Sequence, residues 1–258
     1  MQLMDSHIHL DRYPMDEVDK LVSGWREDGI AGVVAVSMNL ASAYRTLELK
    51  QRYPEFIYAA VGYHPEQPLP CPGELDELIS LLYKERKMIN AVGEVGLPHY
   101  NLEAVRELAA YRELLAEFAL LSVKLDLPLV LHAVHDKAAL AVNVLLLHGV
   151  RKAHFHWLKA PDEVVDRIIE HGYYISVTPE VCYRERDRRL ARRVPLSHLL
   201  LETDGPWPHH GPFAGKMTTP LFLRKSIAAV AKLHGILPEE AAAASSQAVQ
   251  NLYGQLGE

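Results

Sequence analysis

The chain has 258 residues, of which 49% are hydrophobic and 23% charged, and its formal net charge is −6. Such a chain can bury a core that needs no disulfide, and its overall charge does not indicate a nucleic-acid-binding surface. The two cysteines, Cys71 and Cys182, lie far apart, which predicts a reducing compartment and hence a cytoplasmic protein. We find no signal peptide and no apolar run of roughly 18 residues, so we expect no membrane association.

Apolar and β-branched runs alternate with amphipathic stretches along the sequence. Runs of this kind predict strands, and apolar residues spaced three and four apart predict helices. In chain order, the predicted strands cover residues 2–6, 32–37, 57–62, 88–93, 128–132, 152–156, 173–177 and 198–203. The predicted helices cover residues 15–28, 40–52, 74–86, 103–125, 136–147, 218–234 and 238–253. One further helix is predicted to begin near residue 161.

Eight strands that alternate with helices indicate an α/β protein whose parallel sheet is covered on both faces. We expect the sheet to close into a (β/α)8 TIM barrel that forms one domain over residues 1–258, because no linker interrupts the alternation. An open, doubly wound sheet is the alternative. Only the barrel brings the first strand beside the eighth.

Polar side chains occur where the predicted strands end, which is where a barrel of this kind has its active site. They are His7, His9, His64, Glu94, His132, His156 and Asp204. Taken one at a time, each has an ordinary alternative as a turn, cap or surface residue. Two histidines at alternate positions of a strand point the same way and can bind one ion. Imidazole and carboxylate ligands suit zinc, manganese or magnesium, and a carboxylate between two ligand groups can bridge two divalent metal ions.

At these positions the sequence resembles the TatD family of metal-dependent deoxyribonucleases, part of the amidohydrolase superfamily. The matching segments follow the family's order over nearly the whole chain. They are Asp5-Ser-His-Ile-His-Leu-Asp11, Gly62-Tyr-His-Pro65, Gly93-Glu-Val-Gly96, Leu131-His132, His156-Trp157, Glu202-Thr-Asp-Gly-Pro206 and Asn251-Leu-Tyr-Gly254.

The resemblance implies a role for each predicted ligand. His7, His9 and Asp204 would hold one metal ion, and Glu94 would bridge both ions. The second ion would be held by two further histidines, His132 and His156. Asp204 would also accept a proton from the attacking water, so the resemblance gives Asp204 and Glu94 catalytic roles.

Two further residues are predicted to support the site. We expect His64 to lie in or beside the pocket without binding metal. We expect Glu202 to orient a ligand histidine, because it lies two residues before Asp204 and both side chains therefore point inward on an extended strand.

The sequence departs from the family's usual pattern at three places. Pro98 stands where the family usually has aspartate, and Val134 stands where it usually has arginine. Leu158-Lys-Ala160 replaces a turn of small residues. None of these changes removes a predicted ligand. All lie where substrate would bind, so they affect the predicted substrate more than the predicted reaction.

A phosphodiester substrate requires cations near the metals, and single-stranded nucleic acid is often bound by stacking on aromatic rings. We predict Lys159 and Arg184 as phosphate contacts and Trp157 as a stacking residue. Further candidates are Tyr63, Trp207, His135, Lys137, His209, His210 and Lys216. The arginine-rich stretch 184–193 has a solvated helix face as its alternative, and the aromatic residues have packing.

The predicted function is therefore metal-dependent hydrolysis of a phosphodiester, as by a deoxyribonuclease, with nucleic acid or a small phosphodiester as substrate. The alternative is hydrolysis of an amide, lactone or small ester on the same barrel. Many relatives of that second type bridge their metals with a carboxylated lysine on the fourth strand, whereas here that strand carries Glu94. A binding protein without activity is disfavoured by the complete set of predicted ligands.

Overall fold

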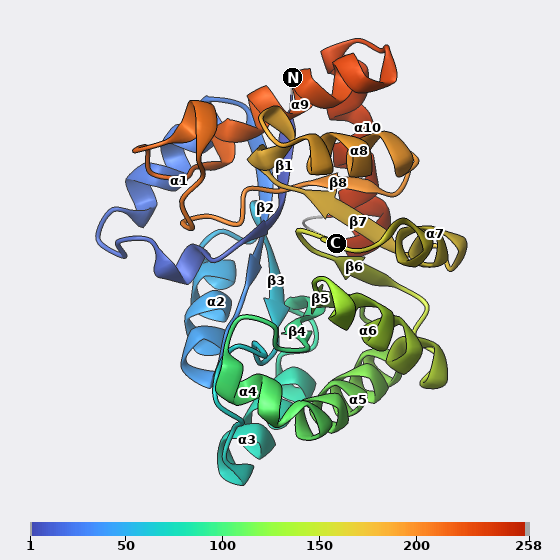
Figure 1. Cartoon of the computed structure of the whole chain (residues 1–258). Helices are drawn as coiled ribbons and strands as arrows, with labels where there is room; N and C mark the ends of the chain where they lie inside the picture. The colour runs from blue at the N-terminus through green and yellow to red at the C-terminus, as the bar shows by residue number, and fades with distance from the viewer. Residues whose placement is uncertain (1, 256–258) are drawn as a thin grey trace.

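The structure is a computed structural model that describes residues 2–255. Eight strands form one sheet in chain order, and each strand pairs in parallel with the next (Figure 1). The strands are β1 (Leu3–Ile8), β2 (Ile30–Val36), β3 (Ile57–Val61), β4 (Ile89–Gly96), β5 (Leu129–His132), β6 (Ala153–Phe155), β7 (Tyr174–Val177) and β8 (Leu199–Leu201).

Helices connect successive strands and surround the sheet (Figure 1). They are α1 (Val18–Glu27), α2 (Leu40–Arg52), α3 (Pro72–Lys84), α4 (Leu102–Arg106), α5 (Leu108–Leu125), α6 (Asp136–Leu147), α7 (Asp162–Glu170), α8 (Glu185–Arg193), α9 (Leu223–His234) and α10 (Pro238–Tyr253). Among residues 2–255, no helix combines the length and the apolar character that crossing a bilayer requires.

The sheet closes between the end of β1 and the segment that follows β8. The amide of Asp204 donates to the carbonyl of His7 at 3.0 Å, and the amide of His9 donates to the carbonyl of Gly205 at 2.7 Å. Ile8 and Gly205 form a parallel bridge between these two bonds. This closure confirms the predicted barrel and excludes the open sheet.

Alternate residues of the strands pack on opposite sides of the sheet, as the two-residue period of a strand requires. In β2, Val34 and Val36 belong to a cluster of buried apolar residues with Tyr58, Val130 and the end of α10. Val33 belongs instead to the larger cluster that includes the surrounding helices. The apolar runs of the sequence therefore supply both the barrel interior and the layer beneath the helices.

The observed elements differ from the predicted ones mainly at their ends. β1 continues to Ile8 because its last residues pair with the segment after β8, and β4 continues to Gly96 because Gly96 pairs with His132 of β5. His7 and Glu94 therefore lie within strands, not after them. The predicted helix 103–125 is two helices, α4 and α5, separated at Glu107, whose backbone leaves the helical region at φ −102° and ψ 24°.

Two predicted helices also begin later than expected. Residues 14–17 form a turn closed by a hydrogen bond from the Glu17 amide to the Pro14 carbonyl, so α1 begins at Val18. The segment from 218 begins with a short 3-10 helix, Pro220–Phe222, before α9. These shifts leave the carboxyl ends of the strands, where the polar residues gather, unchanged.

Candidate metal centre

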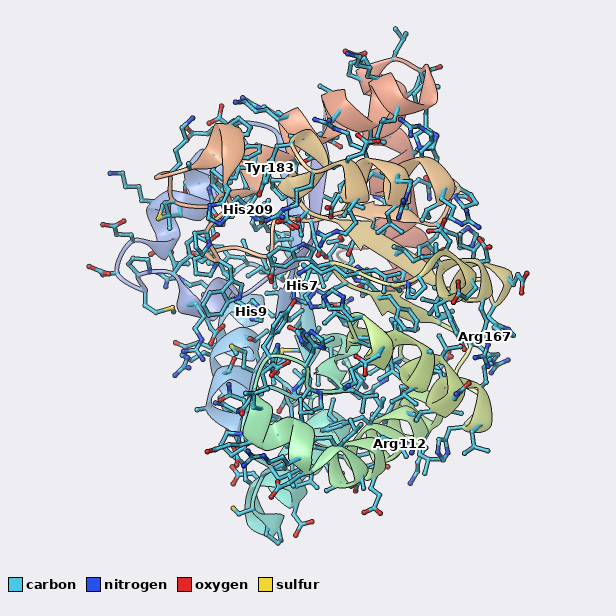
Figure 2. All side chains as sticks on the ribbon, viewed as in Figure 1. His7, His9, Arg112, Arg167, Tyr183 and His209 are labelled. Atoms are coloured by element: carbon cyan, nitrogen blue, oxygen red, sulfur yellow. The ribbon has the colours of Figure 1, made fainter. Side chains whose placement is uncertain are left out.

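His7 and His9 lie near the middle of the molecule, whereas Arg112 and Arg167 project from outer helices (Figure 2). His7 is in β1 and His9 follows it, two residues along, so both rings face the carboxyl end of the barrel interior. Both histidines are almost completely buried. The two histidines therefore lie inside the barrel at its carboxyl end, and solvent scarcely reaches their side chains.

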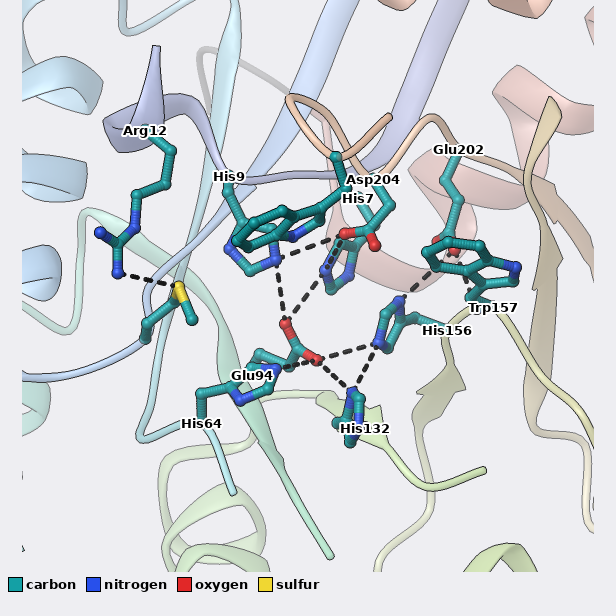
Figure 3. A network of polar contacts seen from close by, with 12 residues as sticks. His7, His9, Arg12, His64, Glu94, His132, His156, Trp157, Glu202 and Asp204 are labelled. Carbon is teal, nitrogen blue, oxygen red and sulfur yellow. Dashed lines mark hydrogen bonds and ion pairs between the residues drawn. The ribbon is translucent and has the colours of Figure 1, made fainter. Parts of the chain in front are cut away.

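The first group of side chains surrounds one oxygen of Glu94. Glu94 Oε2 lies 3.1 Å from His7 Nε2 and 3.5 Å from His9 Nε2 (Figure 3). Asp204 Oδ1 lies 3.5 Å from His7 Nε2 and 3.3 Å from His9 Nε2. The closure of the barrel produces this arrangement, because it joins the Asp204 backbone to that of His7. Asp204 has φ of 51°, a strained conformation for a residue with a side chain, and such strain often occurs at functional sites.

The second group surrounds the other oxygen of the same carboxylate. Glu94 Oε1 lies 2.9 Å from His156 Nε2, 3.1 Å from His132 Nδ1 and 3.1 Å from His64 Nε2 (Figure 3). These three histidines come from the ends of β3, β5 and β6. Glu94 thus faces two separate groups of imidazoles with its two oxygens, as a carboxylate that bridges two cations would.

The donor atoms of both groups fit divalent metal ions. His7 Nε2, Glu94 Oε2 and Asp204 Oδ1 are buried and make no hydrogen bond to any described residue. Buried polar atoms normally have a partner, and nitrogen and carboxylate donors together favour a divalent metal. Among the described residues, four sets have ligand atoms within 4.8 Å of one another: His7, His9 and Asp204; His7, Glu94 and His156; His64, Glu94 and His132; and His7, His154 and Glu202.

The protonation of the site is also compatible with a cation. Burial lowers the pKa of His7 and of His64, so both imidazoles are neutral, the form that binds metal. Burial would raise the pKa of Glu94, but the neighbouring histidines lower it well below its usual range. Burial would lower the pKa of His156, but Glu94 and Glu202 raise it well above its usual range. A divalent ion would displace the proton that His156 carries.

Glu202 lies behind the second group and points inward. It is fully buried, and its Oε1 accepts a hydrogen bond from the Trp157 amide at 2.8 Å and lies 3.4 Å from His156 Nδ1. Its Oε2 accepts a hydrogen bond from the Ser176 hydroxyl at 2.7 Å. Glu202 therefore contacts the nitrogen of His156 that faces away from Glu94.

A cavity of about 460 Å³ opens over these groups. Trp157 and Lys159 line it, and the Lys159 ammonium lies 4.3 Å from the centre of the Trp157 ring. Trp207 also lines the cavity, with its ring 5.9 Å from that of His9. Lys159 is the one lysine or arginine that lines the cavity among the described residues.

Arg184 does not line this cavity. Its side chain is exposed on the outside, and its Nε lies 2.5 Å from Glu180 Oε1. Tyr63 is buried, and its hydroxyl donates to the Pro68 carbonyl at 2.9 Å, away from the metal centre. The structure therefore places neither side chain in the lining of the cavity. The phosphate contact expected of Arg184 stays a prediction.

The sequence prediction missed three residues near the centre. Glu66 and Tyr100 line the cavity, and His154 is buried beneath it. His154 Nδ1 lies 2.8 Å from the Tyr253 hydroxyl, and burial lowers its pKa to about 3. A signal for His154 was present, since it lies two residues before His156 and shares its side of the strand. Neither Glu66 nor Tyr100 follows a strand directly, so strand-end position did not indicate them.

Comparison with known proteins agrees with this geometry. Residues 4–254 match the model of the family described as TatD related DNase. An uncharacterized metal-dependent hydrolase of Haemophilus influenzae is 39% identical over 211 residues, which are 81% of this chain and 83% of that protein. The 3'-5' ssDNA/RNA exonuclease TatD of Erwinia tasmaniensis is 27% identical over 194 residues, 73% of each chain.

The fold agrees as well. The crystal structure of YJJV, a TatD homologue from Escherichia coli, superposes with a TM-score of 0.88 at 25% identity and covers 97% of both chains. The family match extends over almost every described residue and includes the segments that carry the buried histidines and carboxylates. This chain belongs to the TatD family of metal-dependent hydrolases.

Proposed function

We propose that this chain is a deoxyribonuclease that hydrolyses phosphodiester bonds of single-stranded DNA with two divalent metal ions bound around Glu94. The observation that carries the proposal is the position of Glu94, whose two oxygens each face a different group of imidazoles at 2.9–3.5 Å. Zinc, manganese and magnesium are the candidate ions, and the nitrogen-rich donor set favours zinc or manganese over magnesium.

In this proposal, His7, His9 and Asp204 would hold one ion, and Glu94 would hold both. The second ion would be held by His132 and His156. When bound, divalent ions activate water for attack and neutralise the charge that develops on phosphoryl oxygens. His64 lines the cavity and in this proposal binds no metal ion, although its Nε2 lies as near to Glu94 Oε1 as His132 Nδ1 does, at 3.1 Å.

Asp204 is the proposed general base. Its Oδ1 faces His7 and His9, and the side chain also lines the cavity, so the same carboxylate reaches the ligand group and the space for substrate. Glu202 holds the His156 ring through the 3.4 Å contact at Nδ1, which directs Nε2 towards Glu94. Orientation of a ligand histidine by a carboxylate is common in metal sites.

The cavity lining supports a single strand as substrate. Val134 lines the cavity where the family usually has arginine, and it provides no positive charge. Lys159, which also lines the cavity, provides one. Trp157 and Trp207 supply the aromatic surfaces on which bases stack in single-strand binding. The exonuclease of Erwinia tasmaniensis is named for activity on single-stranded DNA and RNA, so RNA belongs among the substrates to test.

The two free cysteines, Cys71 and Cys182, support the cytoplasm as the proposed location.

The test is a hydrolysis screen with added Zn²⁺, Mn²⁺ or Mg²⁺. It compares single-stranded DNA, duplex DNA, RNA, a chromogenic phosphodiester, esters and lactones. We expect release of nucleotides from single-stranded DNA by the wild-type chain and none by Glu94→Ala, with Glu113→Ala, which replaces an exposed glutamate of α5 outside the cavity, as the control. Hydrolysis of lactones or esters without cleavage of any phosphodiester would establish the alternative function.

A further inference from the structure

Glu66 is held unusually firmly at the wall of the cavity. Its Oε1 accepts hydrogen bonds from the backbone amides of His99 at 2.7 Å and Tyr100 at 3.0 Å, and its Oε2 accepts one from Asn101 at 2.6 Å. The Asn101 side-chain amide also donates to the Glu66 carbonyl at 3.2 Å. Glu66 therefore joins the loop after β3 to the loop after β4. Hydrogen bonds to an ionised carboxylate are among the strong ones in proteins.

The same carboxylate contacts a proposed metal ligand. Glu66 Oε1 lies 3.2 Å from His132 Nε2, while His132 Nδ1 faces Glu94 Oε1 at 3.1 Å. Both ring nitrogens face carboxylate oxygens, which only accept hydrogen bonds, so in a ring that binds a metal ion through Nδ1 the remaining proton is on Nε2 and is donated to Glu66. Nδ1 then keeps its lone pair, which is what binding a metal ion requires.

We propose that Glu66 is a positioning residue that fixes the orientation and the tautomer of His132, so that Nδ1 faces the second metal ion. This inference rests on the proposed metal centre. Each histidine proposed to hold the second ion then has a carboxylate at its other ring nitrogen, Glu66 for His132 and Glu202 for His156. The two carboxylates differ in origin, because Glu202 follows a strand whereas Glu66 lies in a loop.

The experiment measures Co²⁺ binding by the full chain after removal of metals with a chelator. Co²⁺ accepts nitrogen and oxygen ligands, and its visible absorption reports the ligands around it. The variants are Glu66→Gln, His132→Ala and the double variant. The control is Glu103→Gln, which removes a charge from an exposed residue of the neighbouring helix. Thermal unfolding of each metal-free variant shows whether it folds.

We expect the wild-type chain and Glu103→Gln to bind two ions. Glu66→Gln is expected to bind one ion as before and the other roughly 10–100-fold more weakly, with a changed absorption spectrum. In the His132→Ala background, Glu66→Gln is expected to add little further loss, because it acts through the missing ring. A merely structural role would produce the same loss in both backgrounds.

Two results would overturn the inference. The first is wild-type affinity and an unchanged spectrum for both ions in Glu66→Gln. The second is a double variant whose loss equals the full product of the two single losses. If the wild-type chain binds no ion, the proposed metal centre itself fails, and that outcome is distinct from a failure of Glu66 alone.

Discussion

Asp204 faces His7 and His9 through a single oxygen, Oδ1, at 3.5 and 3.3 Å. Asparagine at this position keeps an oxygen that can occupy the same place but cannot accept a proton. We expect Asp204→Asn to lower turnover by roughly 10²–10⁴-fold, the contribution typical of a general base. The measurement is the turnover number on single-stranded DNA together with metal content and melting temperature. Near wild-type turnover on every substrate that the enzyme hydrolyses would rule out Asp204 as the base.

Glu94 differs from Asp204 because it contacts both groups of histidines. Its replacement by alanine removes the shared carboxylate and leaves His7 and His156 without their nearest negative charge. We expect Glu94→Ala to lose bound metal as well as activity. Elemental analysis of the purified variant, compared with Asp204→Asn, tests this expectation. Two ions retained in Glu94→Ala would contradict the bridging role.

At the scale of strands, β4 and β5 approach each other very closely beside the candidate metal centre. Gly96 has φ of 150°, and a Cβ on it would lie 2.0 Å from the His132 carbonyl oxygen. We expect Gly96→Ala to destabilise the fold by about 1–3 kcal/mol or more, because the backbone conformation is strained for alanine and the strands must separate. The measurement is the free energy of unfolding in urea.

Gly24 offers the matched control for this substitution. It lies inside α1, and a Cβ on it would meet no atom within 4 Å. Gly24→Ala is expected to stabilise the chain by about 0.5–1 kcal/mol, because alanine favours the helix more than glycine does. Equal changes in unfolding free energy for the two variants would show that the contact with the His132 carbonyl does not cause the loss of stability in Gly96→Ala.

The sequence predicted the order of strands and helices well, because a buried parallel strand requires a continuous apolar run, as 57–62 shows. Position at a strand end also indicated His132 and His156, which the structure brings to Glu94. The ends of β1 and β4 were not predictable from the local sequence, because pairing with distant residues extends them. The ion pair of Arg184 with Glu180, four residues before it, was also not predicted, because the short 3-10 helix that carries Glu180 was not.

At the scale of the whole molecule, metal ions should contribute to stability. The native fold brings the ligands together, so an ion that binds only the folded chain shifts the unfolding equilibrium by mass action. A free ion concentration of 100 times Kd contributes about 2.7 kcal/mol. We expect a chelator to lower the melting temperature of the wild-type chain and added Zn²⁺ or Mn²⁺ to restore it. A shift of the same size in Glu94→Ala would indicate that the ions act elsewhere.

The bridge between Ile8 and Gly205 joins segments from opposite ends of the chain. During synthesis, a ribosome delivers His7 and His9 well before Asp204. Throughout synthesis, the early histidines therefore lack the carboxylate and the backbone partner that complete their group. We therefore expect stable binding of the first ion only after the segment that follows β8 has paired with β1. A chain interrupted before Asp204 would keep both histidines and lack the carboxylate that completes their group, so we expect it to lack hydrolase activity.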